Sequence, residues 1–179
     1  MENTLENNIA KFLTLVDEDI NREGLVDTPK RVAKAWRELL KPEDFNFTVF
    51  ESNGYDEMIM SNQISYYTFC EHHLLPFFGS VDIGYIPNRK IVGLSKLART
   101  VEYYSKRLNT QEYFTNNIAS RIQKELEPKG VGVIVSGRHL CQEMRGIKKQ
   151  GHMVTSALYG CFRDAAAVRK EFLSLTRGD

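Results

Sequence analysis

The chain is poor in the residues that bind soft metals or form covalent cross-links, with three cysteines and four histidines among 179 residues. Three cysteines are too few for a disulfide scaffold, which favours a reducing, cytoplasmic compartment. No run of about 18 apolar residues and no secretory signal pattern is present, which argues against a membrane-spanning or exported protein. A net charge of +1 provides no overall field to attract nucleic acid or an anionic membrane. Any anionic ligand must therefore be held by a local cluster of side chains.

Several signatures of nucleotide chemistry are missing as well. The sequence has no G-x-x-x-x-G-K-[ST] and no G-x-G-x-x-G motif, so neither a P-loop nor a dinucleotide fingerprint explains nucleotide binding. It has no C-x-x-C, which a zinc nucleobase deaminase would require. The composition, 42% hydrophobic and 26% charged, is that of an ordinary globular protein, and the length suits one domain with a substantial core.

The few cysteines and histidines are concentrated in two short segments, Cys70-Glu71-His72-His73 and His139-Leu140-Cys141. Zinc binds thiolate and imidazole in tetrahedral geometry, and a catalytic zinc keeps one position for water. The pattern therefore predicts a metal site, with a turn carrying the first segment and a strand carrying the second, since residues i and i+2 of a strand share a face. A disulfide, or cysteines buried inertly in the core, are the alternative interpretations.

Within such a site the two segments divide into ligands and spare histidines. Cys70, His73 and Cys141 would be the three ligands. His72 and His139 would lie beside the metal, where acid–base chemistry takes place.

Apolar periodicity predicts an α+β domain. The expected order is two helices, two strands, two helices, two strands and a last helix, with an antiparallel arrangement within each strand pair. The helices are expected over residues 5–20, 28–41, 94–108, 111–126 and 165–173, the last capped by Asp164. The strands are expected within 57–86, over 131–136 and near 152–159.

Basic residues near two expected helix starts are candidates for phosphate binding. Ser95 lies at a helix N-terminus, where free N–H groups attract anions, and Lys96 and Arg99 share a face of that helix. With Arg145 and Arg31 they could form a cationic clamp, although such residues are usually solvated.

Gln111 and Glu112 open the next helix. A carboxylate there could accept two hydrogen bonds from the edge of a guanine, but Glu is favoured in a first helical turn in any case.

Taken together, the motifs resemble those of the GTP cyclohydrolase I family. The resemblance runs over nearly the whole chain in the same order. Its motifs are Thr28-Pro29-Lys30-Arg31, Cys70 to Gly79, Gly93 to Arg99, Thr110-Gln111-Glu112, His139-Leu140-Cys141, Met144-Arg145-Gly146 and Glu171-Phe172-Leu173.

The resemblance implies a tunnelling fold, in which an antiparallel sheet has its helices packed on one side. It implies a single domain over residues 1–179, with an N-terminal helical pair within 1–45 and a catalytic core over 57–179. Subunits of this family join edge to edge into a toroid of two stacked pentamers, with active sites between subunits.

The resemblance also implies an activity, the zinc-dependent conversion of GTP and water to 7,8-dihydroneopterin triphosphate with release of formate, the entry step to pterins and folates. By position, Cys70, His73 and Cys141 correspond to the zinc ligands. The remaining matched residues would protonate guanine (His139), transfer protons at the ribose (His72), assist there or at phosphate (Ser95), read the guanine edge (Gln111, Glu112) and hold the triphosphate (Lys96, Arg99, Arg145, and Arg31 from a neighbouring subunit). Two alternatives are another tunnelling-fold enzyme of purines or pterins, and a non-catalytic oligomer with a structural zinc.

Overall fold

The computed structural model describes residues 4–16 and 18–177, which form two compact units, one up to Lys41 and the other from Pro42 onward. Within the described residues, no helix is both long enough and apolar enough to span a membrane. The predicted site residues all belong to the second unit except Arg31, which lies in the first.

The first unit is a pair of helices, α1 (Leu5–Leu15) and α2 (Thr28–Leu39). The Thr4 hydroxyl caps α1 by accepting from the backbone N–H of Asn7 at 3.2 Å, and a proline occupies the first turn of α2. The expected first helix was too long, because the chain leaves helical geometry before Ile20. Ala33 is the one residue of α2 that is fully buried, so this unit has little core of its own.

The second unit is built on a five-stranded sheet with the order β5-β2-β3-β6-β7. The strands are β2 (Ile59–Cys70), β3 (Pro76–Ile86), β5 (Leu108–Asn109), β6 (Gly130–His139) and β7 (Met153–Gly160). The predicted antiparallel pairing of β2 with β3 and of β6 with β7 is confirmed, and β3 also pairs antiparallel with β6. The short β5 adds a parallel edge next to β2.

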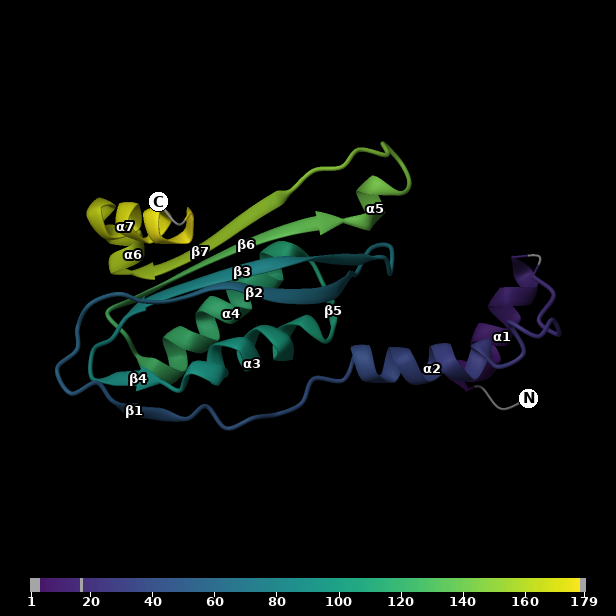
Figure 1. Ribbon diagram of the computed structural model, residues 1–179, viewed down its shortest axis with the longest axis horizontal. Helices are drawn as coiled ribbons and strands as arrows, with labels where there is room; N and C mark the ends of the chain where they lie inside the picture. Colours follow the sequence, from purple (N-terminus) through teal and green to yellow (C-terminus); the bar gives the residue numbers. More distant parts are fainter. Residues whose placement is uncertain (1–3, 17, 178–179) are drawn as a thin grey trace. The chain divides into compact units, whose positions relative to one another are not determined.

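Two helices cover one face of this sheet, α3 (Leu94–Ser105) and α4 (Gln111–Leu126) (Figure 1). Their apolar stripes pack on alternate residues of β3 and β6, such as Val81, Ile83 and Val133, which are all fully buried. Leu108 was expected to continue α3, but it belongs to β5 and is exposed. A second small sheet pairs β1 (Val49–Glu51) with β4 (Lys90–Val92), and neither strand was among those expected from the sequence.

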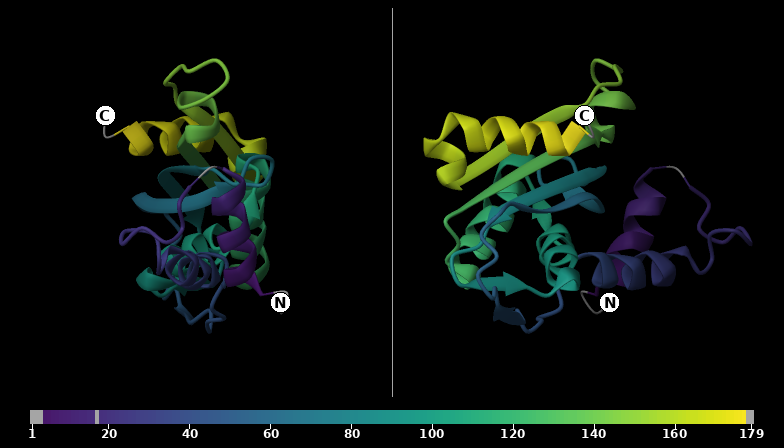
Figure 2. Two further views of the ribbon diagram at one scale, coloured as in Figure 1. Left: turned by 90° about the vertical axis from the view of Figure 1, so that its right-hand side faces the viewer. Right: turned by 60° about the vertical axis from the view of Figure 1, so that its left-hand side comes forward.

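The expectation that all helices pack on one side is wrong. Helices α6 (Cys161–Asp164) and α7 (Ala166–Arg177) lie on the face opposite α3 and α4 (Figures 1 and 2). Phe162 and Phe172 are fully buried there, with their ring centroids 5.2 Å apart. A Cβ on Gly132 would lie 2.5 Å from Phe162 and 2.8 Å from Phe172, so glycine is needed to admit the two rings. The expectation that Asp164 caps the last helix is wrong, because Asp164 is the final residue of α6 and α7 begins at Ala166.

Candidate metal centre and active site

The three predicted ligands come together where β2 and β6 end. Cys70 is the last residue of β2, His73 lies in the turn toward β3, and Cys141 lies in the short helix α5 (Leu140–Glu143) that follows β6. Their ligand atoms all lie within 4.8 Å of one another. The prediction that Cys141 continues a strand is wrong, because the chain turns into α5 directly after His139.

The geometry of this group fits a zinc ion. Zinc bonds of about 2.3 Å to sulfur and about 2.0 Å to nitrogen place tetrahedral ligands about 3.5 Å apart. Cys70 Sγ and His73 Nδ1 are 3.7 Å apart. All three cysteines are free, so the structure contains no disulfide alternative. Burial raises the pKa of the Cys141 thiol, and the neighbouring Cys70 raises it further. A bound cation would have the opposite effect, because it stabilises the thiolate form.

His72 lies beside the ligand group without joining it. Its Nδ1 is 3.8 Å from Cys70 Sγ, and its Nε2 is 3.8 Å from Glu71 Oε1. The side chain is 65% exposed.

His139 is held far more firmly than His72. Its ring stacks on that of Phe77 with centroids 4.5 Å apart and planes inclined by 6°, and its Nε2 is 2.9 Å from Gln111 Oε1. Partial burial lowers the pKa of His139, while Glu112 and Glu143 oppose that shift.

Gln111 is buried, with 1% of its surface exposed, in contrast to its exposed neighbour Glu112. Its amide nitrogen donates to Val135 O at 3.1 Å, Met153 O at 2.9 Å and Thr155 Oγ1 at 3.1 Å. The sequence identified Gln111 as a candidate but gave no sign of these partners, because they come from β6 and β7, distant along the chain.

A clamp that sequence reasoning missed fixes α5 to the end of β6. Arg138 donates from Nε to Glu143 Oε1 at 3.0 Å and from Nη2 to Oε2 at 2.6 Å. The guanidinium lowers the pKa of the Glu143 carboxyl. This two-point contact spans the helix that carries Cys141. The two residues are five apart, a spacing that matches neither helical nor strand periodicity, so the sequence did not indicate the contact.

The phosphate-binding candidates divide between the two ends of the sheet. Arg145 lies two residues after the end of α5, the helix that carries Cys141. Ser95 and Lys96 follow β4, where Val92 N–H donates to the Tyr85 hydroxyl at 3.1 Å. Tyr85 is eight residues along β3 from Phe77, a separation of roughly 25 Å. Within one chain, therefore, the start of α3 is remote from the metal group.

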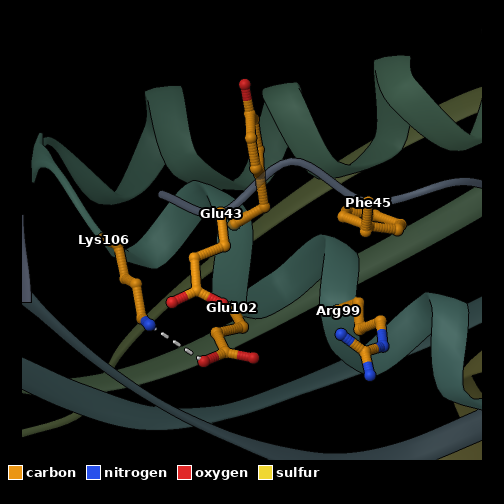
Figure 3. A pocket seen from close by; sticks show the side chains of 6 residues that line it. Glu43, Phe45, Arg99, Glu102 and Lys106 are labelled. Carbon is orange, nitrogen blue, oxygen red and sulfur yellow. Dashed lines mark ion pairs between the residues drawn. The ribbon is translucent and has the colours of Figure 1, made fainter. Parts of the chain in front are cut away.

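Arg99 lines a small pocket between α3 and the segment that precedes β1 (Figure 3). The pocket also contains Glu43, Glu102 and Lys106, and Lys106 pairs with Glu102 at 3.2 Å. In the other unit, Arg31 makes local contacts, donating to Gly24 O at 2.9 Å and to Thr28 Oγ1 at 3.0 Å.

A family model described as GTP cyclohydrolase I matches residues 5–177, nearly the whole chain. The chain belongs to the GTP cyclohydrolase I family. GTP cyclohydrolase 1 of Aquifex aeolicus is 50% identical over 172 residues, which cover 95% of this chain and 94% of that protein. GTP cyclohydrolase 1 of Coxiella burnetii is 47% identical over 184 residues, covering 99% and 100%. A solved structure of apo archaeosine synthase QueF-Like, with 14% identity and a TM-score of 0.40 over 57% of this chain, is too distant to bear on function.

Proposed function

We propose that this chain converts GTP and water to 7,8-dihydroneopterin triphosphate with release of formate, and that it does so at the Cys70–His73–Cys141 group. Membership of the GTP cyclohydrolase I family supports the reaction. The main support for locating the reaction at this group is that three soft ligands lie within 4.8 Å of one another, next to the oriented imidazole of His139. A structural zinc would not require that second group.

In this proposal Cys70, His73 and Cys141 hold zinc. When bound there, zinc supplies a Lewis acid that makes water nucleophilic near neutral pH. His139 gives a proton to the imidazole-ring nitrogen of guanine next to C8, the carbon that leaves as formate. A histidine side chain can both give and regain a proton near neutral pH.

The remaining side chains complete the site. His72 transfers protons as the ribose opens, and Glu112 accepts two hydrogen bonds from the guanine edge. Lys96, Arg99 and Arg145 hold the triphosphate, with Ser95 at its ribose side and Arg31 reaching in from another copy. Because Lys96 is remote from the metal group within one chain, we propose that α3 of a neighbouring copy supplies it, in a toroidal oligomer. Thiolate ligands must stay reduced to hold a metal, and we therefore propose a cytoplasmic location.

Incubation of the metal-analysed protein with GTP tests this proposal. Formate and pterin should appear in equal amounts, the pterin being detected by fluorescence after oxidation, and both should disappear with a chelator. His139→Ala should keep its zinc and lose formate release. Loss of zinc in that variant, or absence of both products from zinc-loaded wild type, would support a structural metal instead.

A further inference from the structure

Gln111 lies at the centre of a hydrogen-bond network that the proposed reaction leaves unexplained. Its side chain is buried, although a residue that reads a substrate should face the site. The amide nitrogen points at two carbonyl oxygens, of Val135 and Met153, which can only accept hydrogen bonds. The opposite orientation would place the amide oxygen against both carbonyls, and so the direction of the amide is fixed by β6 and β7.

Two threonines extend the same network. Thr155 accepts from the Gln111 amide nitrogen, and its hydroxyl lies 2.6 Å from that of Thr115. The Thr115 hydroxyl donates to the Gln111 backbone carbonyl at 2.6 Å. Thr155 can then donate to Thr115, so the three residues form a closed ring with a single consistent direction. Both ends of Gln111, backbone and amide, are therefore anchored.

The fixed amide dictates the protonation of His139. Gln111 Oε1 is an acceptor only and lies 2.9 Å from His139 Nε2, so Nε2 must carry the hydrogen. The lone pair of the neutral imidazole is then on Nδ1. The Phe77 ring, 4.5 Å away and nearly parallel, fixes the plane of the imidazole, while the hydrogen bond fixes its rotation within that plane.

We propose that Gln111 is a positioning residue that holds His139 as the Nε2–H tautomer, so that Nδ1 is the atom through which His139 exchanges its proton with the substrate. The identity of the substrate in this assignment rests on the proposed function. The tautomer does not, because it follows from the hydrogen bonds of Gln111. Gln111 was expected to bind guanine together with Glu112. In this proposal Gln111 instead contacts the His139 imidazole, and Glu112 alone binds the guanine edge.

The tautomer can be measured directly in zinc-loaded wild type by 15N NMR with labelled histidine, at a pH where the imidazole is neutral. Four histidines make assignment by single substitution practical. The His139 signals should show a protonated Nε2 and an unprotonated Nδ1. A protonated Nδ1 would overturn the proposal, whether or not the protein acts on GTP.

Gln111→Met removes the amide while keeping the length of the side chain. This variant should bind zinc normally, lose about tenfold to a hundredfold in kcat with KM for GTP changed less than about threefold, and lose the single tautomer of His139. A raised KM with unchanged kcat would instead show that Gln111 reads the substrate. Gln123→Met makes the same exchange three turns along α4, at a side chain whose amide oxygen has no hydrogen-bond partner among the described residues, and it should leave kcat and the His139 signals unchanged.

Discussion

Replacing Gly137 with alanine would add one methyl group where Tyr66 and Gln111 approach the end of β6. A Cβ at this position would lie 2.6 Å from Gln111 Oε1 and closer still to the Tyr66 hydroxyl. The backbone itself tolerates alanine, because Gly137 is not among the residues with positive φ. The effect of the substitution therefore depends on which neighbour moves.

Neither neighbour can move freely. The Tyr66 ring lies edge-on to Phe77 at 6.0 Å and against Phe114 at 4.8 Å, and burial raises the pKa of its hydroxyl. The Gln111 amide nitrogen has three acceptors. Overpacking of this kind costs about 1–3 kcal/mol, which corresponds to a fall in Tm of roughly 2–12 °C for a chain of this size.

The substitution should also lower the activity of the folded protein. A displaced Gln111 Oε1 releases His139, and misplacing a reacting group by about 1 Å can cost up to a hundredfold in rate. Gly137→Ala should therefore lower kcat by about tenfold to a hundredfold at a temperature where it is fully folded. Its zinc content should match wild type, because the three ligands lie elsewhere.

Formate release, metal analysis and thermal unfolding of the same preparation test this reasoning. Gly151→Ala is the matched control, since its Cβ would meet nothing nearer than Gln142 Nε2 at 3.8 Å. Wild-type kcat in folded Gly137→Ala would refute the link between Gly137, Gln111 and His139. A loss of zinc in that variant would show that the end of β6 shifts as a whole.

Two further predictions concern the second face of the sheet and the α5 clamp. Phe172→Ala should lower the free energy of unfolding by about 3–5 kcal/mol in urea titrations, because it empties a fully buried site, whereas Leu175→Ala on the exposed side of α7 should cost under about 1 kcal/mol. Arg138 lowers the pKa of Glu143, so its stabilising contribution is complete above the ordinary glutamate pKa of about 4.3 and is lost as pH falls through the lower folded value. Glu143→Gln should therefore be less stable than wild type at neutral pH, with the difference shrinking below about pH 4; a constant difference between pH 3 and about pH 7 would exclude this linkage.

The sequence predicted those parts of the fold that depend on local patterns. Helix α4 has its expected bounds because Thr110 caps it, accepting from Tyr113 N–H at 3.2 Å, and because apolar residues recur at helical spacing up to Leu126. The clustering of cysteine and histidine likewise pointed to the three ligands, since few other soft groups were available.

Features that depend on distant partners were not predictable in this way. The position of α6 and α7 follows from glycines at 84 and 132, which make room for Phe172, and an isolated glycine in a strand does not indicate which ring will fill the space. The burial of Gln111 requires carbonyls of β6 and β7, supplied 24 and 42 residues away. Cys141 was assigned to a strand because an i, i+2 spacing suits one, although a helical turn after β6 brings it to Cys70 as well.

The same glycines also fix the register that builds the site. Gly79 lies opposite Gly137 and Gly84 lies opposite Gly132, in the ladder that pairs Phe77 with His139. The two glycine pairs are five residues apart, an odd number, so they open opposite faces of the sheet. One pair admits Phe172, and Gly137 of the other admits Tyr66 and Gln111. If β6 slipped by one residue against β3, His139 would turn to the α7 face and valine side chains would point at Phe162 and Phe172. The packing that excludes this slip therefore also keeps the imidazole beside the metal ligands.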